Sequence, residues 1–197
     1  MIEEMVLANS ENSATATEKS LVIAGFGGQG VLLCGKIAAN IFMMNGKKVT
    51  WYPCYGSEMR GGAVNCEIVV SDEEVTSVHK KQTDILLTLN DISFKRFLPQ
   101  VKDGGIIIAN TTLIKDIKEE RNIRFIKAPI TEKAAELGNV RVTNMVALGL
   151  LSTLFDNVDF SHIHDIIKDM LPKSKSELAE LNFRAFSAGR ELRGENN

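Results

Sequence analysis

The stretch with the clearest capacity for chemistry is a six-residue segment that holds four glycines. Its residues are Gly25, Phe26, Gly27, Gly28, Gln29 and Gly30. An apolar run at residues 21–24 precedes it, and residues 31–44 after it are apolar at helical spacing. A strand, a glycine loop and a helix in this order bring bare backbone N–H groups and the positive end of a helix to one place. The segment therefore predicts a phosphate-binding loop.

Two familiar phosphate motifs are matched only in part. The segment has the G-x-G-x-x-G spacing of dinucleotide sites, but the strand predicted at residues 48–52 is followed by Pro53 and Cys54, where such sites have an acid that binds a ribose. Residues 30–36 match most of a P-loop, yet Ile37 stands where a Ser or Thr would bind magnesium. A turn that only permits close packing of helix on sheet is the structural alternative to a phosphate site.

A second candidate segment covers residues 55–62 and combines glycine, aromatic, acidic and basic residues. It follows the second predicted strand, which places it at the same sheet edge as the glycine loop. Arg60 is available there for an anion, in a ligand or subunit contact with Tyr55 and Glu58. The alternative is a surface loop in which Glu58 pairs with Arg60.

Composition excludes several classes of protein. The 197 residues are 44% hydrophobic and 24% charged with a net charge of -2, which is not typical of disordered, membrane or nucleic-acid-binding chains. No apolar run approaches the roughly 18 residues that span a bilayer, and no signal pattern opens the chain, so we expect a cytoplasmic protein.

The three cysteines, Cys34, Cys54 and Cys66, are too widely spaced for a disulfide framework or an iron–sulfur site. Cys54 is expected in a loop with an exposed thiol.

Hydrophobic periodicity predicts the remaining elements. Strands are expected at residues 21–24, 48–52, 63–71, 84–90, 106–109 and 123–127, and helices at 31–44, 132–137, 144–151, 163–170 and about 174–192. The first two strands should run parallel, while the strand at 63–71 follows without a helical crossover and could be antiparallel. The helix at 144–151 is apolar on nearly all faces and should be buried in the domain or at a subunit interface. The last helix has a thin apolar stripe, which favours packing at an edge or on a partner.

Three polar residues are expected at element ends. Asn90 is a candidate polar contact at the glycine-loop edge, with Asp91 beside it as a helix cap. Thr131 is expected to cap the helix after the sixth strand.

The predicted fold is a three-layer α/β/α domain over residues 20–193. Its sheet is expected to be mostly parallel, or mixed if the strand at 63–71 is antiparallel, with a Rossmann-like first β-α-β unit and a helical C-terminal third. Residues 1–19 are predicted to be a flexible lead-in.

The glycine segment, residues 55–62 followed by Asn65 and Cys66, and residues 144–149 together closely resemble the gamma subunit of 2-oxoacid:ferredoxin oxidoreductases, within the pyruvate/ketoisovalerate oxidoreductase family. The 2-oxoglutarate type is the most similar, and the likeness runs over residues 21–190. It implies a three-layer α/β unit that assembles with alpha and beta subunits and, in some members, a delta subunit. The assembled enzyme converts a 2-oxoacid and coenzyme A (CoA) to acyl-CoA and CO2 and reduces ferredoxin.

The resemblance also implies a role for the glycine loop. Gly27, Gly28, Gln29 and Gly30 match a family site where the backbone meets CoA phosphates, and Asn144 matches an asparagine that approaches the coenzyme. The predicted site therefore comprises Gly25, Phe26, Gly27, Gly28, Gln29, Gly30, Tyr55, Glu58, Arg60 and Asn144. The 3'-phosphate of CoA would be repelled by the acid of a dinucleotide site, whereas Lys47, Lys48 or Arg60 would accept it. Ser57 replaces a proline that many relatives have.

Thiamine diphosphate, magnesium and iron–sulfur clusters are expected on partner subunits, because this chain lacks both the cysteine spacing and the Gly-Asp-Gly motif for them. The chain is then one subunit of an enzyme and is not catalytically complete alone. Three alternatives stay open: another 2-oxoacid such as pyruvate, a branched-chain 2-oxoacid or indolepyruvate; a purely structural assembly role; and a free-standing Rossmann-type enzyme. An isolated chain is expected to self-associate through a surface meant for partners.

Overall fold

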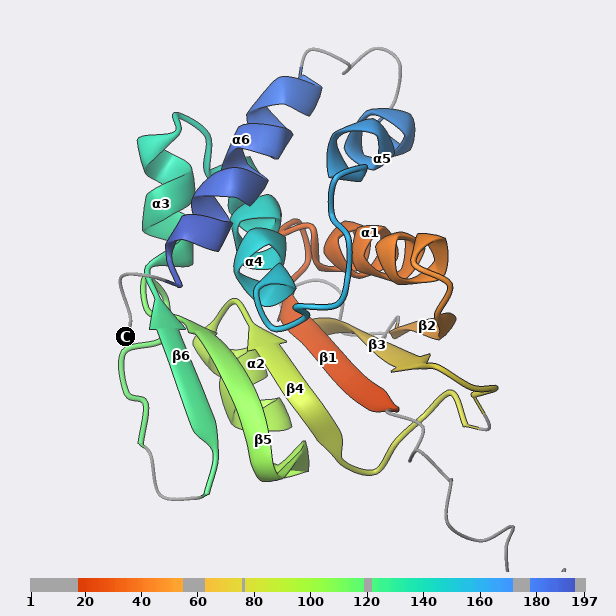
Figure 1. The fold of residues 1–197 in the computed structure, drawn as a ribbon. Coiled ribbons are helices and arrows are strands. Elements are labelled where there is room, and N and C mark those ends of the chain that lie inside the picture. Colours follow the sequence, from red (N-terminus) through yellow and green to blue (C-terminus); the bar gives the residue numbers. More distant parts are fainter. Residues whose placement is uncertain (1–17, 55–62, 76, 119–121, 172–177, 194–197) are drawn as a thin grey trace, which may run out of the picture.

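The computed structural model describes residues 18–54, 63–75, 77–118, 122–171 and 178–193, which form an α/β structure on one six-stranded sheet (Figure 1). The strands are β1 (Lys19–Phe26), β2 (Lys48–Cys54), β3 (Ala63–Ser71), β4 (Thr83–Thr88), β5 (Val101–Asn110) and β6 (Arg124–Ala128). All six predicted strands are confirmed. β5 starts earlier than expected, because residues 101–105 extend the strand instead of forming a turn.

The sheet is mixed, with the order β2-β3-β1-β4-β5-β6. β3 lies between β1 and β2 and is antiparallel to both, while β1, β4, β5 and β6 are parallel neighbours. β1 and β2 thus run in the same direction, as predicted, but they do not pair with each other. The insertion of β3 moves β2 to the edge of the sheet.

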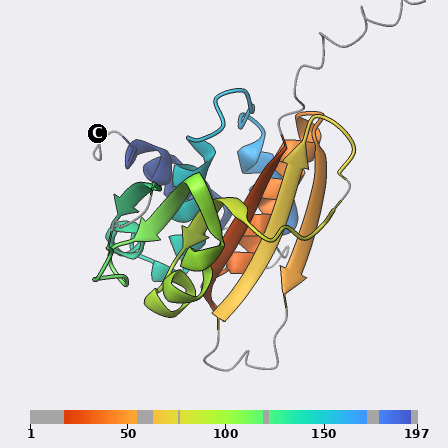
Figure 2. The ribbon, with the colours of Figure 1, turned by 90° about the horizontal axis from the view of Figure 1, so that it is seen from below.

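Helices cover the two faces unequally (Figures 1 and 2). One face carries α1 (Val31–Met44), α3 (Ile130–Glu136), α4 (Thr143–Ser152), α5 (Ile163–Met170) and α6 (Leu178–Glu191), and the other carries α2 (Asp91–Phe97). Side chains of β1 alternate between the faces: Leu21 and Ile23 belong to the larger core under the five helices, and Val22 and Ala24 to the core under α2. The predicted three-layer α/β/α architecture is confirmed.

Two helices on the larger core, α4 and α6, pack at unusually close range. Every residue of α4 is buried, as its all-round apolar sequence predicts, and its main partner is α6. A Cβ atom on Gly149 would lie 1.9 Å from the carbonyl oxygen of Phe186, and one on Gly189 would lie 2.0 Å from that of Val146. The prediction that the last helix lies outside the core is therefore wrong. Its small residues, not bulky apolar ones, let its backbone reach α4.

Helix ends differ from two of the sequence predictions. Asn90, not Asp91, is the N-cap of α2. Pro129 precedes the first turn of α3, so Thr131 lies within that helix and is not its cap. None of the helices in the described ranges is long and apolar enough to cross a membrane.

Candidate functional site

The glycine loop follows β1, and β1 and its parallel neighbour β4 are followed by helices on opposite faces of the sheet. From β1 the chain passes through α1 on one face to β2, and from β4 it passes through α2 on the other face to β5 (Figure 1). β1 and β4 are adjacent and parallel, so their C-terminal ends diverge at this point. In open α/β sheets such a switch point forms the crevice that binds ligands.

The loop backbone is shaped for an anion. Gly28 and Gly30 have positive φ angles of 96° and 72°, and Gly27 and Gly28 are exposed. Within the described part of the chain, nothing accepts a hydrogen bond from the N–H groups of Gly27, Gly28 or Gly30. α1 begins directly after the loop, without a side-chain cap and without an acid in its first turn. Its positive end is therefore open to a negative ligand.

The glycines of the loop differ in what surrounds them. A Cβ atom on Gly28 would meet nothing within 4 Å, whereas one on buried Gly25 would lie 2.7 Å from Oε1 of Gln29. On Gly30 it would lie 2.4 Å from Nδ2 of Asn144, and that amide donates to the Gly30 carbonyl at 3.3 Å. The structure thus brings predicted residue Asn144 to the loop, from the first turn of α4. Of these three glycines, only Gly28 has open space where a ligand could lie.

The side chain of Gln29 folds back onto the loop. Its Oε1 accepts from the backbone N–H of Phe26 at 2.6 Å and from Nδ2 of Asn90 at 3.1 Å. Asn90 is almost fully buried, and its Oδ1 accepts from the N–H of Ser93 as the cap of α2. Ser93 also donates from Oγ to the carbonyl of Gly25. The loop is therefore fastened to the start of α2.

A second buried amide side chain makes similar contacts at the end of β5. Asn110, at the end of β5, donates from Nδ2 to the Leu89 carbonyl at 3.0 Å and to Thr131 Oγ1 at 2.8 Å. Its Oδ1 accepts from the N–H of Thr131. Sequence reasoning missed Ser93 and Asn110, although a polar residue directly after a buried strand, the signal that identified Asn90, was also present at Asn110.

Two of the three cations expected near the 3'-phosphate, Lys47 and Lys48, are far from the loop. Lys47 and Lys48 lie at the start of β2, level with the end of β3 and the start of β1, so they occupy the opposite edge of the sheet from the loop. They pair there with Asp72 and Glu74. This prediction is wrong because the direction of β2 places its first residues farthest from the loop. Tyr55, Glu58 and Arg60 lie outside the described residues, as does Ser57.

Three thiols are present and none has the environment of a thiolate. Burial, together with the nearby Cys66, raises the pKa of the Cys34 thiol, and burial raises that of Cys66 to about 12 despite a contact from Trp51. Cys54 is half-buried at the end of β2, and burial and then Glu67 raise the pKa of its thiol, against opposing effects of Asn65 and Arg96. In the described ranges, no three His, Cys, Asp or Glu side chains converge to hold a metal ion.

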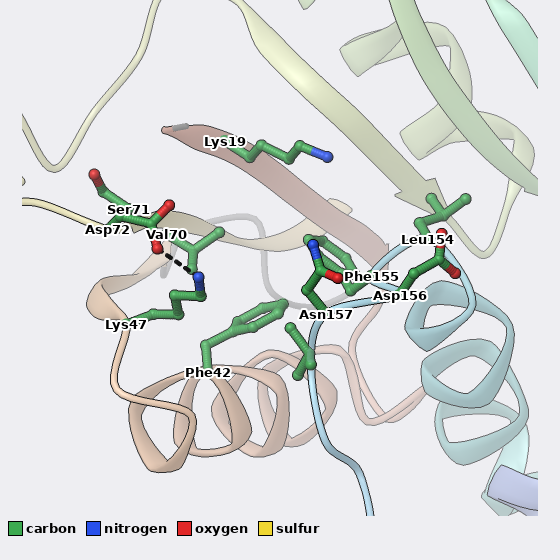
Figure 3. Close-up of a pocket in the computed structure, with 11 residues that line it drawn as sticks. Lys19, Phe42, Lys47, Val70, Ser71, Asp72, Leu154, Phe155, Asp156 and Asn157 are labelled. Atoms are coloured by element: carbon green, nitrogen blue, oxygen red, sulfur yellow. Dashed lines mark hydrogen bonds and ion pairs between the residues drawn. The ribbon is translucent and has the colours of Figure 1, made fainter. Parts of the chain in front are cut away.

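A separate cavity of about 210 Å³ lies at the other edge of the sheet (Figure 3). Lys19 extends from the start of β1 toward the turn after α4, with its ammonium 5.6 Å from the ring centre of Phe155. Phe42 and Val70 form its apolar walls, and Lys47 pairs with Asp72 at its rim. This cavity shares no residue with the glycine loop and therefore does not belong to the candidate site.

The amino-acid sequence matches the family model "Pyruvate ferredoxin/flavodoxin oxidoreductase" over residues 20–192. The chain is 37% identical to the 2-oxoglutarate synthase subunit KorC of Methanothermobacter marburgensis, covering 88% of this chain and 96% of that protein. It is 35% identical to the ketoisovalerate oxidoreductase subunit VorA of the same organism, where it covers 87% of this chain and 36% of that protein. The chain thus spans about a third of VorA.

Solved structures give the same result. The gamma subunit of a keto/oxoacid ferredoxin oxidoreductase from Geobacter sulfurreducens superimposes with a TM-score of 0.76 at 28% identity, covering 90% of this chain and 99% of that one. A 2-oxoglutarate:ferredoxin oxidoreductase from Magnetococcus marinus shares the fold with a TM-score of 0.82 at 22% identity, covering 91% of this chain and 32% of that one. The chain therefore belongs to the pyruvate ferredoxin/flavodoxin oxidoreductase family, as a gamma-type subunit.

Proposed function

We propose that this subunit binds the phosphate groups of CoA at its glycine loop and so positions CoA within a 2-oxoacid:ferredoxin oxidoreductase, with 2-oxoglutarate as the 2-oxoacid. The observation that carries the proposal is the exposure of Gly27 and Gly28 at the open N-terminus of α1, at the switch point of the sheet. The Magnetococcus relative was solved with 2-oxoglutarate, CoA and succinyl-CoA bound, which supports the choice of ligand. The KorC relative supports the choice of 2-oxoacid.

In this proposal the chain supplies binding and orientation. The N–H groups of Gly27 and Gly28 donate to phosphate oxygens, and the N-terminus of α1 adds its positive field. Arg141, which is exposed and precedes Asn144 by three residues, is the cation that we assign to a further phosphate. Holding CoA in one orientation lowers the entropic cost of bringing its thiol to the acyl group on a partner subunit.

An iron–sulfur cluster does not fit the described cysteines of this subunit, and we assign thiamine diphosphate and magnesium to the partners with it. Cys34 and Cys66 are buried in the packing of α1 on β3, and Cys54 stands at the end of β2. Such a donor set does not form a cluster site. We therefore assign these groups to alpha and beta subunits. Tyr52, Ile92 and Leu113, exposed apolar side chains near the C-terminal ends of β2, β4 and β5, form the surface that these partners would cover.

The CoA site is tested with a matched pair of variants at Gly28. Asn and Asp both tolerate a positive φ and have the same shape, but Gly28→Asp adds a negative charge where phosphate would lie. Titration calorimetry with CoA, on the chain co-purified with its partner subunits, should show Gly28→Asp binding at least about tenfold more weakly than Gly28→Asn. Equal affinities in the two variants, with equal melting temperatures, would rule out a phosphate at this loop.

A purely structural role for the loop is the second candidate. It is favoured by the spaces at Gly25 and Gly30, which Gln29 and Asn144 occupy. It predicts that CoA affinity is unchanged in every Gly28 variant that assembles.

The choice of 2-oxoacid is tested by assaying the co-purified complex with 2-oxoglutarate and 2-oxoisovalerate. Faster ferredoxin reduction with 2-oxoisovalerate would replace the KorC-type assignment with the VorA type.

A further inference from the structure

Four groups form a hydrogen-bonded chain in which the donors converge on Gln29 Oε1. The N–H of Phe26 donates to Gln29 Oε1, which also accepts from Asn90 Nδ2, while Asn90 Oδ1 accepts from the N–H of Ser93. A backbone N–H can only donate, so each end of the chain requires an oxygen. Both side-chain amides are thereby fixed in orientation by the backbone, and neither can rotate by 180° without losing a bond.

The orientation of Gln29 determines which of its amide atoms is available to a ligand at the loop. Its Oε1 is engaged by the loop and by Asn90, which leaves its Nε2 group. Across the described ranges, no acceptor lies within hydrogen-bonding distance of this Nε2, and it is not among the buried unpaired atoms. The half-buried Gln29 side chain therefore has two N–H donors without an acceptor among the described residues, one position after exposed Gly28.

We infer that Asn90 is a positioning residue for anion binding: it holds Gln29 so that Oε1 shapes the loop and Nε2 donates to the bound phosphate. This inference rests on the proposed function for the identity of the ligand. The positioning itself rests on the contacts of the ligand-free chain. Asn90 is suited to the task because it is almost fully buried, caps α2 and reaches Gln29 with its other amide atom.

Three substitutions separate this role from simple helix capping. Gln29→Glu keeps the acceptor for Phe26 and Asn90 but replaces Nε2 by a second oxygen. Asn90→Asp keeps the cap of α2, since Asp is as good an N-cap as Asn, but turns an oxygen toward Gln29 Oε1 and forces that amide to rotate. Asn90→Ser keeps a cap and only removes the bond to Gln29. Asn157→Asp, an exposed change of the same charge at the opposite sheet edge, is the control.

Two measurements are made on each variant. Hydrogen exchange of the Phe26 amide in the ligand-free chain should be faster in Asn90→Asp than in wild type, because Phe26 loses its acceptor, and should be unchanged in Gln29→Glu. CoA affinity of the co-purified complex should fall by about tenfold or more in Gln29→Glu and Asn90→Asp. It should fall less in Asn90→Ser, where Gln29 is released but not turned, and stay unchanged in Asn157→Asp.

The outcomes discriminate between the two proposals. Unchanged Phe26 exchange and unchanged CoA affinity in Asn90→Asp would overturn the inference and leave Asn90 as a helix cap only. Failure of the wild-type complex to bind CoA would overturn the proposed function and the ligand contact of Gln29, while Phe26 exchange would still decide whether Asn90 orients Gln29. Equal CoA affinities in Asn90→Ser and Asn90→Asp would also contradict the positioning role.

Discussion

The two edges of the sheet differ in how neighbouring segments are joined. At the first edge, where β1, β4 and β5 begin, the segments are joined by ion pairs. At the second edge, where these strands end, they are joined by neutral side-chain amides. The ion pairs at the first edge are Lys47–Asp72, Lys48–Glu74, Lys80–Glu18 and Lys102–Asp84. At the second edge Gln29, Asn90, Asn110 and Asn144 bind backbone groups or one another. Amides satisfy buried polar groups without placing a carboxylate beside the glycine loop. Both edges are thus joined by polar contacts, but those at the second edge use uncharged side chains. This suits the anion site proposed at that edge.

The largest effect is expected where a charge replaces a buried amide. Asn110→Asp would set a carboxylate against the Leu89 carbonyl and lower the free energy of unfolding by about 3 kcal/mol or more. Urea denaturation should show this loss at pH 7 and a partial recovery at low pH, where Asp is protonated. Asn139→Asp is the control, because that residue only caps the 3-10 turn Val140–Val142 and Asp serves equally well. Similar losses in both variants would contradict the contrast between the edges.

A smaller effect tests the contact between α4 and the loop. Gly30→Ala would place a methyl group 2.4 Å from Asn144 Nδ2 on a backbone with positive φ, at a cost of about 2 kcal/mol. Asn144→Ala should cost about 1 kcal/mol through its lost hydrogen bond. The double variant should be more stable than the sum by about 1 kcal/mol, because the clash disappears. Additive losses in thermal unfolding would mean that the two residues do not touch.

Two glycines, one at each edge, offer a matched pair. Gly28 and Gly46 both have positive φ and open space where a Cβ atom would stand. Each change to Ala should cost about 1 kcal/mol of stability. CoA affinity should fall only in Gly28→Ala, since Gly46 lies at the turn from α1 into β2. Equal affinities would show that the two edges do not differ toward the ligand.

The smallest effect concerns pH and the charged edge. Burial alone would raise the pKa of Asp84, but hydrogen bonds from Lys102 and Ser20 outweigh burial and hold it below its usual value. A lowered pKa in the folded state stabilises the protein above the unfolded pKa. This contribution is lost as pH falls below about 4. The urea midpoint should therefore drop less between pH 7 and pH 3 in Asp84→Asn than in wild type. Exposed Asp116→Asn, which should follow wild type, is the control.

The sequence predicted the bounds of helices and strands better than it predicted which elements and residues lie next to one another in space. The strand at Ala63–Ser71 and the helices Val31–Met44 and Ile163–Met170 were predicted with their final bounds, because alternation and helical periodicity are local properties. The glycine loop between β1 and α1 was recognised for the same reason. Lys47 and Lys48 were misplaced because they come before or at the start of β2, and the start of a strand that runs in the direction of β1 lies at the sheet edge opposite the loop. α6 was excluded from the core because a stripe of Ala and Gly carries little hydrophobic signal.

The sequence by itself determined that a glycine loop joins a buried strand to an apolar helix, that no ribose-binding acid follows, and which family the chain resembles. Each of these depends on residue types at short spacing. Only the tertiary structure decided that β3 separates β1 from β2, that Gln29 turns its oxygen to Asn90, and that Asn144 fills the space at Gly30. These contacts join residues far apart in the chain, and they form because buried polar groups must find partners wherever the packing brings them.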